Sequence, residues 1–88
     1  LEHEKTRTRP TKPIVLELGA GCGLVGMGLA CSGLFGRVVV TDASTEWLQQ
    51  NVDKNHSRFS CPVDVLALQW GKRQDHDALQ TYLKTRLP

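Results

Sequence analysis

The residues of this chain that are best suited to chemistry gather around one glycine-rich segment. Seven of the eight glycines lie between Gly19 and Gly36, and the segment 17–23 has the sequence ELGAGCG. It directly follows a short apolar run, as expected of a buried strand that ends at glycine. A strand that bends straight into a helix leaves backbone N–H groups pointing over the carboxyl edge of its sheet, where α/β proteins bind ligands. The segment therefore predicts a site for a nucleotide-like molecule.

Two carboxylates flank this bend in the sequence. Glu17 lies in a strand otherwise suited to burial, where an unpaired carboxylate is costly. The ammonium group of a methionine-like ligand would be a suitable partner, and hydrogen bonds to the backbone of the bend are the alternative. Asp42 ends a second apolar run about 20 residues after the glycines, where an acidic side chain can accept hydrogen bonds from ribose hydroxyls. Its alternative role is to cap the next helix, although Ser44 and Thr45 are also available as caps.

The register of the glycines bears on the ligand class. Gly21, Gly23 and Gly26 match the G-x-G-x-x-G string of dinucleotide-binding folds. The string begins two residues later than Gly19, the first glycine after the strand. Together with Glu17, this register disfavours a NAD-dependent oxidoreductase. Asp42 does not distinguish the ligands, because NAD and S-adenosylmethionine both carry a ribose.

These residues need a scaffold, and the apolar pattern supplies one. Strands are predicted at 14–18, 37–42 and 62–70, the last interrupted by Asp64; helices are predicted from 24 to about 33, from 44 to about 55, and over 75–87. The alternation of strands and helices with short connections predicts an α/β fold, with three parallel strands and flanking helices.

The helical spacing also predicts which residues are buried. In the first helix these are Leu24, Met27, Cys31 and Leu34, and Gly33 ends the helix. In the second helix they are Leu48 and Val52, with Trp47 nearby. In the last helix they are Leu79, Tyr82, Leu83 and Leu87, and Asp75 is the cap. Gly26 and Gly28 each cost roughly 1 kcal/mol inside a helix. Close packing of the helix on the sheet would explain why glycine is present at these two positions.

Composition limits the class of protein. The chain has 88 residues, 40% of them hydrophobic, and a net charge of +2. Four basic residues, Lys5, Arg7, Arg9 and Lys12, lie in the opening arm, which we interpret as solvated because it lacks aromatic residues; we do not expect nucleic acid as a partner. No apolar run approaches the roughly 20 residues of a membrane span. The sequence does not indicate an oligomeric state.

The cysteines do not form a recognisable metal or disulfide pattern. Cys22, Cys31 and Cys61 are odd in number and, with the three histidines, make no zinc motif. We interpret them as three buried thiols, which favours an intracellular protein, cytoplasmic or nuclear.

Four segments resemble one enzyme family. They are IVLELGAGCGLVGMG at 14–28, VVVTD at 38–42, the spacing of Leu48, Asn51 and Asn55, and LQWG at 68–71. Together they resemble the class I, seven-β-strand protein-lysine methyltransferases of the methyltransferase-like group. The resemblance covers residues 14 to 71. It implies a partial Rossmann-like class I methyltransferase fold, with the N-terminal half of a methyltransferase domain at 13–88. Residues 1–12 are polar and are expected to form a flexible arm.

The resemblance also implies a cofactor, S-adenosyl-L-methionine. Gly19, Ala20 and Gly21 would line its methionine and ribose, Asp42 would hold the ribose, and Trp70 would lie beside the adenine. An indole at the carboxyl end of a strand is an apolar platform for a purine, whereas filling core at the sheet edge is the alternative role of Trp70. The predicted cofactor site comprises Glu17, Gly19, Ala20, Gly21, Gly23, Asp42 and Trp70. We predict no catalytic residue and no metal ligand in this chain, and we interpret His56 as a surface residue.

The function implied is methyl transfer to a lysine of a protein substrate. The acidic residue and tyrosine that the family places at its lysine site follow a fourth strand, which would begin after Pro88. A methyltransferase acting on a small molecule or RNA remains open. So does a non-catalytic remnant or interaction module, because a small three-stranded unit buries little of its surface and leaves the edge of its first strand unpaired. A NAD-binding oxidoreductase fragment is the remaining alternative.

Overall fold

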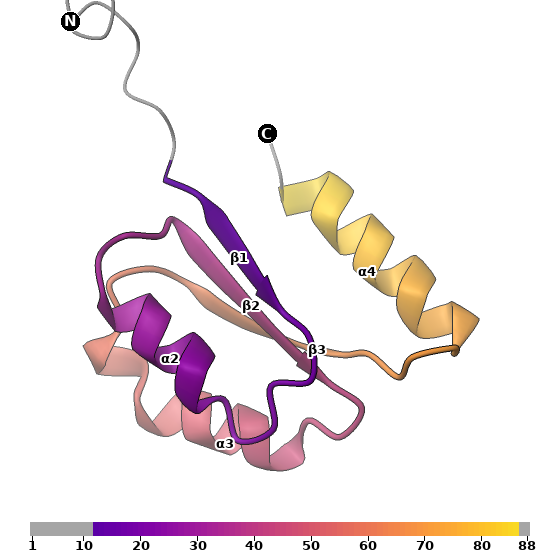
Figure 1. Cartoon of the computed structure of the whole chain (residues 1–88), viewed down its shortest axis with the longest axis horizontal. Coiled ribbons are helices and arrows are strands. Elements are labelled where there is room, and N and C mark those ends of the chain that lie inside the picture. Colours follow the sequence, from indigo (N-terminus) through magenta and orange to yellow (C-terminus); the bar gives the residue numbers. More distant parts are fainter. Residues whose placement is uncertain (1–11, 87–88) are drawn as a thin grey trace, which may run out of the picture.

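The computed structural model describes residues 12–86, which form a three-stranded sheet with helices on both faces (Figure 1). The strands are β1 (Ile14–Glu17), β2 (Arg37–Asp42) and β3 (Val63–Ala67), and the helices are α2 (Leu24–Cys31), α3 (Glu46–Lys54), the 3-10 turn η1 (His56–Arg58) and α4 (Arg73–Arg86). All strand pairs are parallel, in the order β1-β2-β3. This confirms the predicted fold class. The predicted flexible arm, except Lys12, lies outside the described residues.

The main core lies between the sheet and the pair α2 and α3, which cover the same face in Figure 1. It consists of Ala30, Val38, Val40, Leu48 and Val52, all nearly or fully buried. Alternate residues of a strand point to the same face, so Val38 and Val40 both reach the helices. The predicted buried face of the second helix, Leu48 and Val52, is confirmed.

The predicted buried face of α2 was wrong. Gly26 and Ala30 are its buried residues, whereas Leu24 is 73% exposed. The cause is the close approach of the helix to the sheet: a Cβ atom on Gly26 would lie 2.4 Å from Cγ1 of Val40. Small residues therefore face the sheet, and large ones point away from it. The packing explanation fails for Gly28, where an added Cβ would meet nothing within 4 Å.

The remaining members of the predicted face of α2 differ from one another. Met27 is half-buried, whereas Leu34 and Cys31 are exposed. Gly33, with a φ of 78°, follows the last residues of α2 and ends it as predicted.

The interpretation of the cysteines as three buried thiols was also wrong. Cys22 is exposed because it lies in the bend, and Cys31 is exposed at the end of α2. Cys61 is half-buried, and burial raises the pKa of its thiol. The cysteines therefore give no support to the inference about cellular compartment, which stays a prediction.

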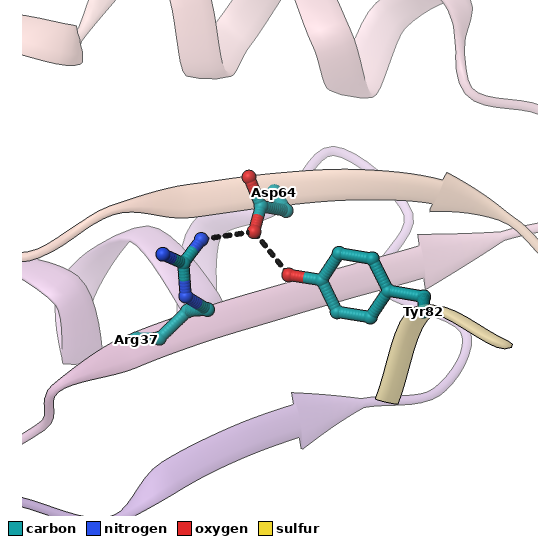
Figure 2. A network of polar contacts seen from close by, with 3 residues as sticks. All are labelled: Arg37, Asp64 and Tyr82. Atoms are coloured by element: carbon teal, nitrogen blue, oxygen red, sulfur yellow. Dashed lines mark hydrogen bonds and ion pairs between the residues drawn. The ribbon is translucent and has the colours of Figure 1, made fainter. Parts of the chain in front are cut away.

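The opposite face of the sheet carries α4, which is held by polar contacts (Figure 2). Asp64 accepts a hydrogen bond from the hydroxyl of Tyr82 and forms an ion pair with Arg37. The bond to Asp64 raises the pKa of the Arg37 guanidinium. Burial, and then the bond to Asp64, raise the pKa of Tyr82. The charge that interrupts the apolar pattern of the third strand thus connects β2, β3 and α4.

Candidate functional site

The bend after β1 is fastened to the end of β2 by three hydrogen bonds. The amide of Ala20 donates to the carbonyl oxygen of Thr41 at 2.7 Å, and the amide of Gly21 donates to Oδ2 of Asp42 at 2.8 Å. The hydroxyl of Thr41 donates in turn to the carbonyl oxygen of Glu17 at 2.8 Å. These bonds hold the bend against the carboxyl ends of β1 and β2. Gly19, Gly21 and Asp42 therefore lie together at this edge of the sheet, as predicted.

The expectation that the amides of the bend point into empty space was wrong for three of them. Ala20 and Gly21 donate to β2, and the amide of Gly23 donates to the carbonyl oxygen of Ala20 at 2.9 Å. Acceptors at the end of β2 lie close enough to use these groups. These three N–H groups are therefore not free to bind a ligand, which would instead contact the exposed surface of the bend.

That surface is open over two glycines. Gly19 has a φ of 68° and Gly21 a φ of 60°, in the left-handed region that favours glycine. A Cβ atom built on either residue would meet nothing within 4 Å. Side chains do not block the bend, so a ligand can approach its backbone.

Gly23 differs from these two glycines. It is buried, and a Cβ atom there would lie 2.6 Å from Cδ1 of Leu48 on α3. The geometry gives Gly23 a packing role, and its place among the ligand contacts remains a prediction.

Two further residues support the bend and were not among the predicted site residues. Asn51 on α3 donates from Nδ2 to the carbonyl oxygen of Cys22 at 2.9 Å. Thr41, fully buried at the end of β2, connects β1 and the bend. The spacing of Leu48, Asn51 and Asn55 was noted in the sequence, but not this role for Asn51.

Glu17 places a buried carboxylate oxygen without a hydrogen-bond partner just before the bend. Its Oε1 is buried and has no hydrogen-bond partner among the described residues. It lies under α2, where a Cβ atom on Gly26 would be 2.8 Å away. The alternative in which the carboxylate bonds the backbone of the bend is not observed for this oxygen. A buried carboxylate oxygen of this kind is suited to a cationic or hydrogen-bonding partner.

Asp42 is ionised and already makes two hydrogen bonds. It accepts from the amide of Gly21 and, through Oδ1, from the amide of Ser44 at 3.3 Å. These bonds lower the pKa of its carboxyl, the bond from Gly21 having the largest effect. A carboxylate offers about four acceptor positions, so capacity remains for hydroxyl groups.

The side-chain cap predicted for the second helix was not found. Thr45 is the capping residue of α3 and makes no side-chain cap hydrogen bond. Asp42 instead takes the amide of Ser44, just ahead of the helix.

Trp70 lies in the loop after β3 and is 71% exposed, so it does not fill core among the described residues. It borders a hollow of about 430 Å³ lined by Leu16, Leu18, Leu68, Trp70, His76 and Leu79. Leu18 is the residue before Gly19, so the hollow brings Trp70 to the start of the bend. The amide of Leu68 donates to the carbonyl oxygen of Asp42 at 2.9 Å, which holds the exit of β3 beside the same edge.

Other chemistry-bearing groups lie elsewhere or do not cluster. His56 is exposed in η1, which follows α3 and precedes β3. Within residues 12–86, no three His, Cys, Asp or Glu side chains are grouped so that they could hold a metal ion. None of the helices within those residues has the length and apolar character needed to cross a membrane.

Comparisons with known proteins identify a family and two relatives. A family model described as lysine methyltransferase matches residues 1–84. The chain is 44% identical over 59 residues to Protein N-lysine methyltransferase METTL21A of Xenopus tropicalis, an alignment covering 66% of this chain and 27% of that protein. It is 41% identical over 59 residues to UPF0665 family protein C23C4.06c of Schizosaccharomyces pombe, covering 65% of this chain and 18% of the relative. The aligned region thus spans less than a third of either relative.

Proposed function

Because the chain belongs to the lysine methyltransferase family, we propose that it forms the S-adenosylmethionine-binding part of an enzyme that methylates a protein lysine. The observation that carries this proposal is the bond between the amide of Gly21 and the carboxylate of Asp42. It joins a bend that is open over Gly19 and Gly21 to an ionised acceptor at one sheet edge. That combination suits a ligand with an amino-acid chain and a ribose.

The residues present fit such a cofactor. The buried, unpartnered Oε1 of Glu17 is matched by an ammonium group, and the open surfaces over Gly19 and Gly21 admit a chain close to the backbone. Asp42 retains acceptor positions for ribose hydroxyls. Trp70 offers an exposed indole face for a purine. Ala20 would line the site, with Gly23 supporting the bend from behind.

When bound, S-adenosylmethionine supplies a methyl group activated by its sulfonium. The residues of this chain would bind this cofactor and orient its methyl group. In the complete enzyme, orientation of the lysine amine against the methyl group can lower the barrier by about 7–11 kcal/mol, so little acid or base chemistry is needed. His56 is assigned no role in this chemistry.

A protein lysine is the substrate that the family and the printed name of the frog relative favour. A small molecule or RNA as acceptor is the second candidate, because the bend and Asp42 serve the cofactor alone. The family match does not favour a NAD-binding oxidoreductase or a non-catalytic module. The domain boundaries at 12 and 13 and an intracellular location remain predictions.

The proposal is tested by calorimetric titration of the chain with S-adenosylhomocysteine and, separately, with NADH. We expect saturable binding of S-adenosylhomocysteine and no comparable binding of NADH. Tighter binding of NADH would contradict the proposal. Loss of S-adenosylhomocysteine binding by Trp70→Ala, but not by Trp47→Ala, would support the part assigned to Trp70, since Trp47 lies exposed on α3.

A further inference from the structure

The loop that carries Trp70 is held by two side chains of the first turn of α4. Oδ2 of Asp75 accepts a hydrogen bond from the amide of Gln69 at 2.8 Å, and Nε2 of His76 accepts one from the amide of Gly71 at 3.1 Å. Trp70 stands between these two amides. Both backbone groups that flank the indole are therefore fixed from α4.

The ends of the loop are fixed as well. The amide of Leu68 is bonded to the carbonyl oxygen of Asp42, and the amide of Lys72 donates to the carbonyl oxygen of Gln69 at 3.0 Å. Gly71 turns the chain with a φ of 86°. The indole itself is 71% exposed, so contacts with neighbouring side chains restrain it little. The backbone bonds fix the course of the loop and therefore the direction in which the Cα–Cβ bond of Trp70 leaves it.

We propose that Asp75 and His76 are positioning residues that set the orientation of Trp70 for the purine of the cofactor. This inference rests on the proposed function, because it assigns Trp70 to the cofactor site. It goes beyond that proposal by giving the first turn of α4 a part in arranging the site. His76 lines the same hollow as Trp70, so the loop and the hollow are arranged by one helical turn.

A general effect of charge must be separated from this specific role. An acidic residue near the beginning of a helix is stabilising through the helix dipole, whatever it bonds. Asp77 is the matched control, since it is near the same helix end, is 67% exposed and pairs with Arg73 at 4.0 Å rather than with the Trp70 loop. Asp75→Asn is the conservative variant, because its amide oxygen can still accept from Gln69.

The experiment uses Trp70 as its own reporter. The sequence contains two tryptophans, so Trp47→Phe leaves Trp70 as the sole indole. In this background we would record the emission maximum and the anisotropy of Trp70 fluorescence. The variants are Asp75→Ala, Asp75→Asn, His76→Ala, His76→Gln and the control Asp77→Ala. Circular dichroism would monitor folding. Affinity for S-adenosylhomocysteine would be measured on the same proteins.

We expect Asp75→Ala and His76→Ala to lower the anisotropy of Trp70 and to weaken S-adenosylhomocysteine binding by about three- to tenfold. Asp75→Asn and His76→Gln should recover most of both properties, and Asp77→Ala should change neither. Should one Ala variant fail to fold, the other variant pair decides.

Two results would overturn the inference, and they differ in what they say of the proposed function. An unchanged Trp70 signal in the Ala variants would mean that these side chains do not position the loop. A changed signal with unchanged affinity would mean that the orientation of Trp70 does not matter for the cofactor, whereas the proposed function would stand on the binding of S-adenosylhomocysteine by the parent chain.

Discussion

The amide nitrogen of Gly21 lies 2.8 Å from Oδ2 of Asp42, so the bend after β1 and the last residue of β2 form one unit. Asp42 thus has two tasks. Its bonds hold the open backbone of the bend in shape, and its remaining acceptor positions face the same edge of the sheet. Because the bend is ordered before the ligand binds, the binding free energy is not reduced by the entropic cost of ordering it.

Replacement of Asp42 should therefore affect affinity through both tasks. We expect Asp42→Ala to weaken S-adenosylhomocysteine binding by about tenfold or more, since a charge-assisted acceptor is lost together with the fastening of the bend. Asp53→Ala, which removes an exposed carboxylate that accepts a hydrogen bond from Gln49 on α3, is the control and should bind like the parent. Equal affinities of the two variants in calorimetry would remove Asp42 from the site.

The lowered pKa of Asp42 predicts a specific dependence of stability on pH. Hydrogen bonds from the Gly21 and Ser44 amides depress the pKa of this carboxyl below its ordinary value of 3.8. A group of this kind stabilises the fold above its unfolded-state pKa, and the stabilisation disappears as pH falls through its folded-state pKa. The thermal midpoint of the parent should exceed that of Asp42→Asn near neutral pH, and the gap should narrow below about pH 4. A gap that widens in acid would contradict this assignment.

Two glycines of α2 provide a matched test of how closely the helix approaches the sheet. A Cβ atom on Gly26 would lie 2.4 Å from Cγ1 of Val40, so Gly26→Ala should destabilise the fold by about 1–3 kcal/mol. Gly28→Ala places its methyl group in open space and should stabilise by about 0.5–1 kcal/mol, because alanine favours helix. Chemical denaturation measures both. Similar effects of the two substitutions would show that the packing at Gly26 is not as described.

Asn51 should stabilise the bend from α3. Loss of its bond to the carbonyl oxygen of Cys22 in Asn51→Ala should lower the free energy of unfolding by about 1 kcal/mol and weaken binding of S-adenosylhomocysteine a few-fold. Gln50→Ala, an exposed neighbour on the same helix, should leave both quantities unchanged. If Gln50→Ala has the same effect, the bond to Cys22 is not the cause.

Much of the fold followed from apolar periodicity, but the inner face of α2 did not, and the predicted buried face of the last helix was wrong because no described residue of α4 is fully buried. Periodicity selects large apolar residues, and these predicted burial of Leu24 and Leu34. The helix lies so close to Val40 that only small residues, Gly26 and Ala30, fit between helix and sheet. A distance between two elements is a tertiary property, and no local pattern encodes it. The same limit explains the exposed Cys31.

At the site, the sequence predicted the residue types better than their bonds. The bend and Asp42 share one edge because parallel strands bring their carboxyl ends together. That Asp42 would bond the amide of Gly21, rather than leave it for a ligand, depends on how closely the bend approaches the end of β2, which is a tertiary property. The positions of Asn51, Asp75 and His76 could not be foreseen either, because each acts on a loop through a helix whose placement the sequence leaves open.

The most direct test of the account is the heteronuclear NMR spectrum of the labelled chain during titration with S-adenosylhomocysteine. We predict that the largest shifts occur at the amides of Gly19, Ala20 and Gly21 and at the indole N–H of Trp70, while α4 beyond Leu79 and the exposed indole of Trp47 change little. Shifts confined to residues away from the bend, or an equal response to NADH, would contradict the claim that this edge of the sheet binds an adenosyl sulfonium cofactor.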